Sequence, residues 1–184
     1  MRVPALRTER LLLRPFERPD AVWLAESMSD PEVKRLTLDR SLPVEQARVM
    51  AEILTWLHMR RAYWAITLDG EPCGFICLTR TGSLGPSGAY VGFELRRAFW
   101  GRGIATEATR AVAACAFEFF GLRTVRAAVL EPNEASMRVL EKAGLRRGGA
   151  VLLKGARPAF WYEIQREPAA GWRWRCWWRV ARLL

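Results

Sequence analysis

Histidine and cysteine are scarce in this sequence: its 184 residues include one histidine and four cysteines. Cys73, Cys77, Cys115 and Cys176 are scattered among apolar neighbours, and Cys73 and Cys77 lack the further ligands that a zinc site needs. His58 lies near the end of an expected helix, where a surface or hydrogen-bonded histidine is the plain interpretation. We therefore expect no metal, and reduced thiols, three in the core and one in the C-terminal tail.

Long hydrophobic runs are also missing. No stretch approaches the roughly 18 consecutive apolar residues that a membrane-spanning helix needs, and residues 1–4 do not begin the apolar core of a secretory signal. Internal repeats and low-complexity linkers are absent as well. A hydrophobic content of 51% excludes a mostly disordered chain, so we expect one compact domain that stays in the cytoplasm.

Positive charge exceeds negative charge, with a net charge of +10. Arg173, Arg175, Arg179 and Arg182 lie in the last thirteen residues, and the chain without them still carries +6. A basic surface favours phosphate-bearing or acidic partners and argues against a polycationic substrate. Genome composition is an alternative source of a high arginine content.

Hydrophobic periodicity predicts alternating strands and helices. Helices are expected at 20–28, 43–60, 104–120 and 133–143, and strands at 11–16, 63–68, 73–79, 90–95, 124–130, 150–153 and 160–166. Asp20 is a candidate N-cap, Asp69-Gly70 a hairpin turn and Gly144 a helix C-cap. The order predicts an α/β (α+β) fold with a mixed, mostly antiparallel sheet and helices on both faces.

A glycine turn precedes the longest predicted helix. Gly101 and Gly103 lie between a predicted strand and the helix that begins at Ile104, so backbone amides gather at a helix start. A helix start with bare amides attracts anions. A plain tight turn, in which glycine supplies conformational freedom, is the alternative.

The C-terminal segment 171–184 combines tryptophan with arginine. As a helix, this segment would place arginines on one side and apolar residues on another. The arginines are Arg175, Arg179 and Arg182, and the apolar residues are Trp174, Trp177, Trp178 and Ala181. This composition suits weak contact with anionic lipid or with single-stranded nucleic acid. Docking on the body or on a second subunit, or a disordered extension, are the alternatives.

Three segments together, 6–15, 100–108 and 133–145, resemble the GNAT acyltransferase superfamily, in particular its branch of ribosomal-protein-alanine N-acetyltransferases (RimJ/RimL-like). The resemblance covers residues 6 to about 166 and implies a single GNAT domain at 1–166, followed by a tail at 167–184. It implies an N-acetyltransferase that uses acetyl-CoA. The leading acceptor is the N-terminal α-amino group of a protein or peptide, the second a small amine or antibiotic, and the chain would be a monomer or a homodimer.

The family's phosphate-binding pattern maps onto residues 100–105, whose amides would cradle the pyrophosphate of acetyl-CoA. By the resemblance, the cofactor-binding residues are Leu95, Trp100, Gly101, Arg102, Gly103, Ile104, Ala105, Thr106, Asn133 and Ser136. Trp100 replaces the Gln or Arg of the general pattern, which puts a side-chain contact in doubt but leaves the amides in place. The acceptor would be recognised by segments 36–43 and 83–89 and by the last two strands.

The expected reaction is direct attack of an amine on the thioester, with a backbone N–H near Leu95 as the donor to the oxyanion. Ser136 would hydrogen-bond or protonate the departing thiolate, and Asn133 would contact the pantetheine arm. The plain alternative is that Asn133 caps a helix and Ser136 lies in its first turn.

The general base is less clearly indicated. The glutamate of other superfamily members falls on Tyr90, and Glu94 lies four residues later on the same strand face. Glu94 would assist deprotonation, directly or through water. The alternatives are an exposed or ion-paired Glu94 and a Tyr90 that merely packs. A non-catalytic acyl-CoA-binding module, attached by its tail to a membrane or to RNA, is the competing class of function.

Overall fold

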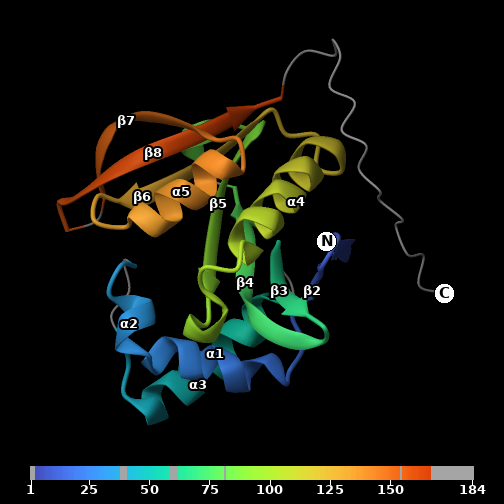
Figure 1. The fold of residues 1–184 in the computed structure, drawn as a ribbon, viewed down its shortest axis with the longest axis vertical. Coiled ribbons are helices and arrows are strands. Elements are labelled where there is room, and N and C mark those ends of the chain that lie inside the picture. Colours follow the sequence, from blue (N-terminus) through green and yellow to red (C-terminus); the bar gives the residue numbers. More distant parts are fainter. Residues whose placement is uncertain (1–2, 38–40, 59–61, 81, 154, 167–184) are drawn as a thin grey trace.

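One mixed sheet runs through the described part of the chain, which is residues 3–37, 41–58, 62–80, 82–153 and 155–166 of a computed structural model (Figure 1). Its strand order is β1-β2-β3-β4-β5-β6-β8-β7. The strands are β1 (Leu6–Arg7), β2 (Leu11–Pro15), β3 (Tyr63–Leu68), β4 (Glu71–Thr79), β5 (Gly88–Leu95), β6 (Thr124–Leu130), β7 (Arg146–Leu153) and β8 (Arg157–Gln165). The helices are α1 (Asp20–Ser29), α2 (Pro31–Lys34), α3 (Val44–His58), α4 (Ile104–Glu118) and α5 (Glu134–Lys142), with short 3-10 turns η1 (Gly82–Leu84) and η2 (Arg97–Phe99).

Strand direction confirms the predicted sheet. Among the described strands β5 and β6 pair in parallel, and every other neighbouring pair is antiparallel. A parallel pair needs a long crossover, and α4 supplies it between β5 and β6. The chain therefore changes its direction of pairing at the centre of the sheet.

Helices cover both faces of the sheet, as the sequence predicted. Trp64 and Ile76 belong to the core that α4 and α5 cover, whereas Ala65 and Phe75, their neighbours in sequence, pack with α1 and α3. Successive residues of a strand point to opposite faces, so the two cores lie on opposite sides. Figure 1 shows α4 alongside β5, with α1 and α3 together at the other end of the molecule.

Local turn chemistry was predicted correctly at two sites. Asp69 and Gly70 have φ angles of 52° and 85°, as a two-residue hairpin turn with both residues in the left-handed region requires. At α5, the Asn133 side chain accepts a hydrogen bond from the backbone N–H of Ser136, and Gly144 follows the helix with φ of 95°. The turn between β3 and β4 and the two ends of α5 are therefore set by the local sequence.

Asp20 is not the N-cap of α1, which corrects that prediction. Pro19 holds the cap position, and the buried Asp20 carboxylate accepts bonds of 2.7 and 2.8 Å from the Arg14 guanidinium. It also accepts from the Glu17 amide and the Trp23 indole. The carboxylate therefore links β2 to α1 and does not cap the helix. Burying a charge is costly unless the charge is paired, and the ion pair with Arg14 meets that need.

The last two strands are longer than predicted, and two short elements, β1 and α2, were not expected. β7 starts at Arg146, and its register shifts between Arg147 and Ala150. A Cβ at Gly148 would lie 2.3 Å from the Trp161 ring, so the glycine makes room for that ring. The predicted tail at 167–184, with Cys176, lies outside the described residues.

Candidate functional site

The strands β5 and β6 part from each other at the centre of the sheet. Their parallel ladder joins Gly88 to Thr124, Ala89 to Val125 and Tyr90 to Arg126, and ends there. β5 continues to Leu95 along β4, while β6 continues to Leu130 along β8. Figure 1 shows β6, β8 and β7 turning away from the other strands. A wedge therefore opens at the carboxyl ends of two parallel strands, where α/β proteins commonly bind ligands.

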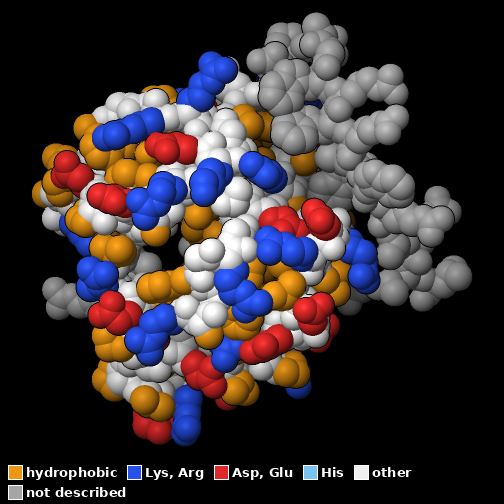
Figure 2. Space-filling model, viewed as in Figure 1, with side chains coloured by type: hydrophobic (Ala, Val, Ile, Leu, Met, Phe, Trp, Pro, Cys, Tyr) orange, Lys and Arg blue, Asp and Glu red, His pale blue; other side chains and the backbone are white. Residues whose placement is uncertain are grey.

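A cavity of about 330 Å³ occupies this wedge. It is lined by α2 and the residues after it, the end of β5, the glycine turn, the start of α4 and α5 as far as Lys142. The predicted cofactor-binding residues all line it, namely Leu95, Trp100, Gly101, Arg102, Gly103, Ile104, Ala105, Thr106, Asn133 and Ser136, and Glu94 lines it too. Figure 2 shows the surface hollowed between the parts that carry α2 and α5, with Lys and Arg side chains around the hollow.

The glycine turn presents backbone amides to the cavity. Gly101 and Gly103 have φ angles of 72° and 75°, which only glycine adopts readily. Nothing lies within 4 Å of a Cβ placed at Gly101, so backbone conformation rather than space requires glycine there. Gly103 is the N-cap of α4 and provides no side-chain cap, which leaves the amides of the first helical turn to an outside acceptor.

Trp100 fastens this turn to the end of β5. Its indole Nε1 donates a hydrogen bond of 2.9 Å to the carbonyl oxygen of Leu95, and the side chain is 46% exposed. Trp100, at the first position of the phosphate-binding pattern, therefore links the glycine turn to the end of β5.

The Leu95 amide points into the wedge. A Cβ at Gly74 of β4 would lie 2.1 Å from the carbonyl oxygen of Glu94, so that carbonyl faces β4. The peptide is trans, and the N–H of Leu95 therefore points to the opposite side, from which β6 has parted. Gly74 was missed by the sequence analysis, although an isolated glycine inside a strand signals close backbone approach.

Glu94 is ion-paired rather than exposed. Its Oε2 lies 2.7 Å from Nζ of Lys34 on α2, and the two side chains are 10% and 7% exposed. The sequence analysis left this ion-paired alternative open but did not name Lys34. Lys34 gave no recognisable signal, because a short helix shows no periodicity.

Tyr90 does not line the cavity. It lies where β5 is still paired on both sides, opposite Thr79 of β4 and Arg126 of β6. The strands part only beyond Tyr90, so its side chain lies outside the cavity lining, and a share of Tyr90 in catalysis stays a prediction. Segment 83–89 is likewise not part of the cavity lining, whereas Leu36 and Thr37 are.

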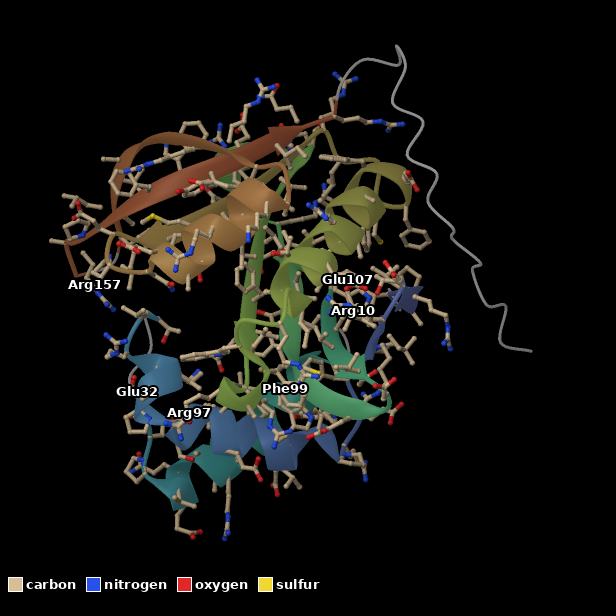
Figure 3. All side chains as sticks on the ribbon, in the orientation of Figure 1. Arg10, Glu32, Arg97, Phe99, Glu107 and Arg157 are labelled. Atoms are coloured by element: carbon tan, nitrogen blue, oxygen red, sulfur yellow. The ribbon has the colours of Figure 1, made fainter. Side chains whose placement is uncertain are left out.

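Asn133 caps α5 and also fastens the loop after α2. Its Oδ1 accepts from the Ser136 amide at 3.0 Å, and its Nδ2 donates to the carbonyl of Leu36 at 3.2 Å. Arg157 of β8 donates to the carbonyl of Thr37 at 2.7 Å, and Figure 3 shows Arg157 reaching toward that loop. Leu36 and Thr37 are thus tied at two points, to Asn133 in the cavity lining and to Arg157 of β8.

Cations outnumber free carboxylates in the cavity. Arg102, Arg138 and Lys142 line it, and Arg138 is paired with Glu134, which does not line the cavity. The Arg102 guanidinium lies 5.5 Å from the centre of the Phe99 ring. The two lining glutamates are both in ion pairs, Glu94 with Lys34 and Glu32 with Arg35. The lining is therefore suited to an anionic ligand.

The cysteines of the described ranges do not line the cavity. Cys73, Cys77 and Cys115 are buried free thiols away from the cavity, as predicted. Burial raises the pKa of Cys73 to about 11 and that of Cys115 to about 12, so both stay protonated at neutral pH. In the described ranges, no three His, Cys, Asp or Glu side chains lie close enough to hold a metal ion, and no helix there has the length and apolar content to span a membrane.

The parted strands, the glycine turn at a helix start and the cavity between them are features of an acyltransferase fold. A family model described as an acetyltransferase (GNAT) domain matches residues 10–146, and the chain belongs to this family. It is 30% identical over 152 residues to the uncharacterised N-acetyltransferase p20 of Bacillus licheniformis, covering 78% of this chain and 83% of that protein. It is 31% identical over 157 residues to the uncharacterised N-acetyltransferase YoaA of Bacillus subtilis, covering 80% and 86%.

Solved structures share the fold. A GNAT acetyltransferase from Bacillus anthracis superposes with a TM-score of 0.77 at 26% identity, over 88% of this chain and 98% of that one. RimL, a ribosomal-protein α-N-acetyltransferase in complex with coenzyme A, gives 0.73 at 18% identity over 88% and 97%. The aminoglycoside acetyltransferase AAC(6')-Ib gives 0.69 at 19% identity over 85% and 95%. The last two likenesses show the fold alone.

Proposed function

We propose that this GNAT acetyltransferase transfers the acetyl group of acetyl-CoA to the N-terminal α-amino group of a protein or peptide. The observation that carries the proposal is the single cavity that joins the amides of the glycine turn to the inward-facing amide of Leu95. The amides of the glycine turn suit a diphosphate, and the amide of Leu95 suits the oxygen of an acyl group.

The donor half of the cavity fits coenzyme A. The bare amides of the first turn of α4 and the guanidinium of Arg102 provide donors and positive charge for the diphosphate. Lys142 on α5 adds further positive charge, and Arg138 on the same helix is paired with Glu134. The solved structure of RimL, which shares this fold, contains coenzyme A.

The chemical step is a direct displacement. The amine nitrogen forms a bond to the thioester carbon while the amide of Leu95 donates to the oxyanion, and the carbon–sulfur bond then breaks. The thiolate takes a proton from Ser136 or through it, and Glu94 assists removal of the proton that the amine loses. Ser136 lines the cavity, and its hydroxyl forms no hydrogen bond to another residue in the described ranges.

The charges of the cavity favour a peptide amine over an aminoglycoside. A polycationic acceptor needs carboxylates that are not already neutralised, and Glu32 and Glu94 are each paired with a cation. A single α-amino group on an otherwise neutral chain avoids the repulsion from Arg102 and Lys142. The same charges disfavour the aminoglycosides that AAC(6')-Ib, by its name, acetylates.

Release of free thiol from acetyl-CoA tests the acceptor class. We expect turnover with peptides that begin with Ala or Ser, none with the same peptides blocked at the N-terminus, and little with small amines or aminoglycosides. Ser136→Ala should lower kcat about 100-fold, while Ser29→Ala on α1 serves as the control. Activity confined to small amines would exclude the peptide acceptor, and a Glu94→Gln variant that keeps the parent rate across pH would exclude Glu94 as a base.

A further inference from the structure

The hairpin formed by β1 and β2 is bonded to the first turn of α4 through the carboxylate of Glu107. Oε1 of Glu107 accepts from the Thr8 hydroxyl at 2.6 Å and from the Arg10 amide at 3.0 Å. Its Oε2 accepts from Nε of Arg10 at 2.8 Å and lies 2.7 Å from Nη2. Figure 3 shows Arg10 and Glu107 pointing toward one another. Both oxygens are therefore held by donors almost a hundred residues away in sequence.

Arg10 also holds the glycine turn itself. Its Nη1 donates a hydrogen bond of 3.1 Å to the carbonyl oxygen of Arg102, and a Cβ at Gly103 would lie 3.4 Å from its Nη2. Because the peptide between Arg102 and Gly103 is trans, the N–H of Gly103 points away from Arg10. Gly103 lines the cavity and Arg10 does not, so this direction is the cavity side.

The same contacts compensate the negative charge of Glu107, which lies beside the proposed anion site. A carboxylate in the first turn of α4 is favoured by the helix dipole, yet it would repel a diphosphate bound at that turn. Burial would raise the pKa of Glu107, but hydrogen bonds from Thr8 and Arg10 outweigh it and hold the pKa below its ordinary value. The carboxylate therefore stays ionised, and the Arg10 guanidinium compensates its charge.

We propose that Arg10 is a positioning residue for the acyl donor: the planar guanidinium, anchored on Glu107, fixes the Arg102 carbonyl and thereby aims the Gly103 amide at the diphosphate. This inference rests on the proposed function. Arg10 acts through the backbone of the turn and does not itself touch the donor. Lysine cannot replace it, since a point charge cannot hold the Glu107 carboxylate and the Arg102 carbonyl together.

Two acyl donors separate positioning from general folding. Acetyl-CoA carries the diphosphate, whereas S-acetylpantetheine presents the same thioester without it. For Arg10→Gln we expect the Kd of CoA, measured by calorimetry, to rise roughly tenfold, and kcat/KM for acetyl-CoA to fall by a similar factor. The kcat/KM for S-acetylpantetheine should change less than about twofold, since that donor makes no use of the oriented amide. Arg10→Lys should lose nearly as much as Arg10→Gln.

The control is Arg48→Gln, which removes the same charge from the exposed surface of α3 and should leave both donors unaffected. A parent chain that does not bind CoA would overturn the proposed function, and this inference with it. A parent that binds CoA, together with an Arg10→Gln variant of equal affinity, would overturn the inference alone. Equal losses with both donors, or full rescue by lysine, would also overturn it, because they would indicate a folding role or a charge effect.

Discussion

Gly74 is the residue on which the direction of the Leu95 amide most directly depends. Its φ of 152° lies at the edge of the region that favours glycine, and β4 approaches β5 closely at this point. A side chain here would push on the peptide between Glu94 and Leu95, which carries the proposed donor to the oxyanion. The position therefore links a backbone packing requirement to the chemical step.

Gly74→Ala should lower kcat at least tenfold and reduce the free energy of unfolding by about 1–3 kcal/mol. The added Cβ would lie 2.1 Å from the carbonyl oxygen of Glu94 and 2.7 Å from Cα of Leu95, so the peptide must shift. Thiol release and chemical unfolding measure the two effects.

Gly92→Ala in β5 is the matched control, because its Cβ would meet Sγ of Cys77 at an ordinary 3.5 Å. We expect that variant to keep its kcat. Equal kcat values for the two variants would show that the Leu95 amide does not need its present direction.

The glycine turn at 100–106 could be located from a local signal, whereas the assignment of Leu95, Asn133 and Ser136 to the donor rests on the family resemblance. Two glycines before a helix indicate bare amides at a helix start, whatever the rest of the chain does. Lys34 and the contact of Arg10 with Glu107 could not be predicted in this way. Both depend on segments that meet only after folding, and a lysine in a four-residue helix looks like any surface lysine.

At the scale of elements, α5 and the loop after α2 are joined by one side chain with two tasks. The Oδ1 of Asn133 caps the helix, and its Nδ2 holds the carbonyl of Leu36 across the cavity. Aspartate retains the capping oxygen but has no amide to donate. The two tasks can therefore be separated by a single substitution.

Asn133→Asp should keep the stability of the parent and raise the KM for the acceptor several-fold, because the loop after α2 loses one of its two ties. Asn133→Ala should raise the KM similarly and also lose about 1 kcal/mol of stability with the cap. Thermal unfolding and steady-state kinetics separate the effects. Unchanged acceptor KM in both variants would show that the tie to Leu36 plays no part in acceptor binding.

Elements with strong periodicity or turn chemistry were predicted, and short or irregular ones were not. The hairpin at Asp69-Gly70 and the capped helix α5 carry their own boundary signals. β1 has two residues and α2 has four, too few for a period to show. β7 begins with two arginines and two glycines, and its pairing with β8 is decided by the fit of Trp161 against Gly148.

At the scale of the whole molecule, the site exists because one sheet divides. The antiparallel strands β1 to β5 and the group of β6, β8 and β7 share only a short parallel ladder, and beyond it the two halves separate. α4 and α5 begin at this opening, and the basic lining matches the positive charge of the chain. The sequence predicted a mixed sheet with helices on both faces. The separation of β5 from β6 could not be predicted, because it is seen only in the strand pairing of the folded chain.

The central claim is that the wedge between β5 and β6 binds coenzyme A through the amides of the glycine turn. Titration of CoA into the isotopically labelled chain, followed by amide NMR shifts, tests it directly. We expect the largest shifts at Leu95, at Gly103 to Thr106 and at Ser136, with little change at Ala25 and Val44 in the groove between α1 and α3. Largest shifts in that groove, or none at the glycine turn, would contradict the account.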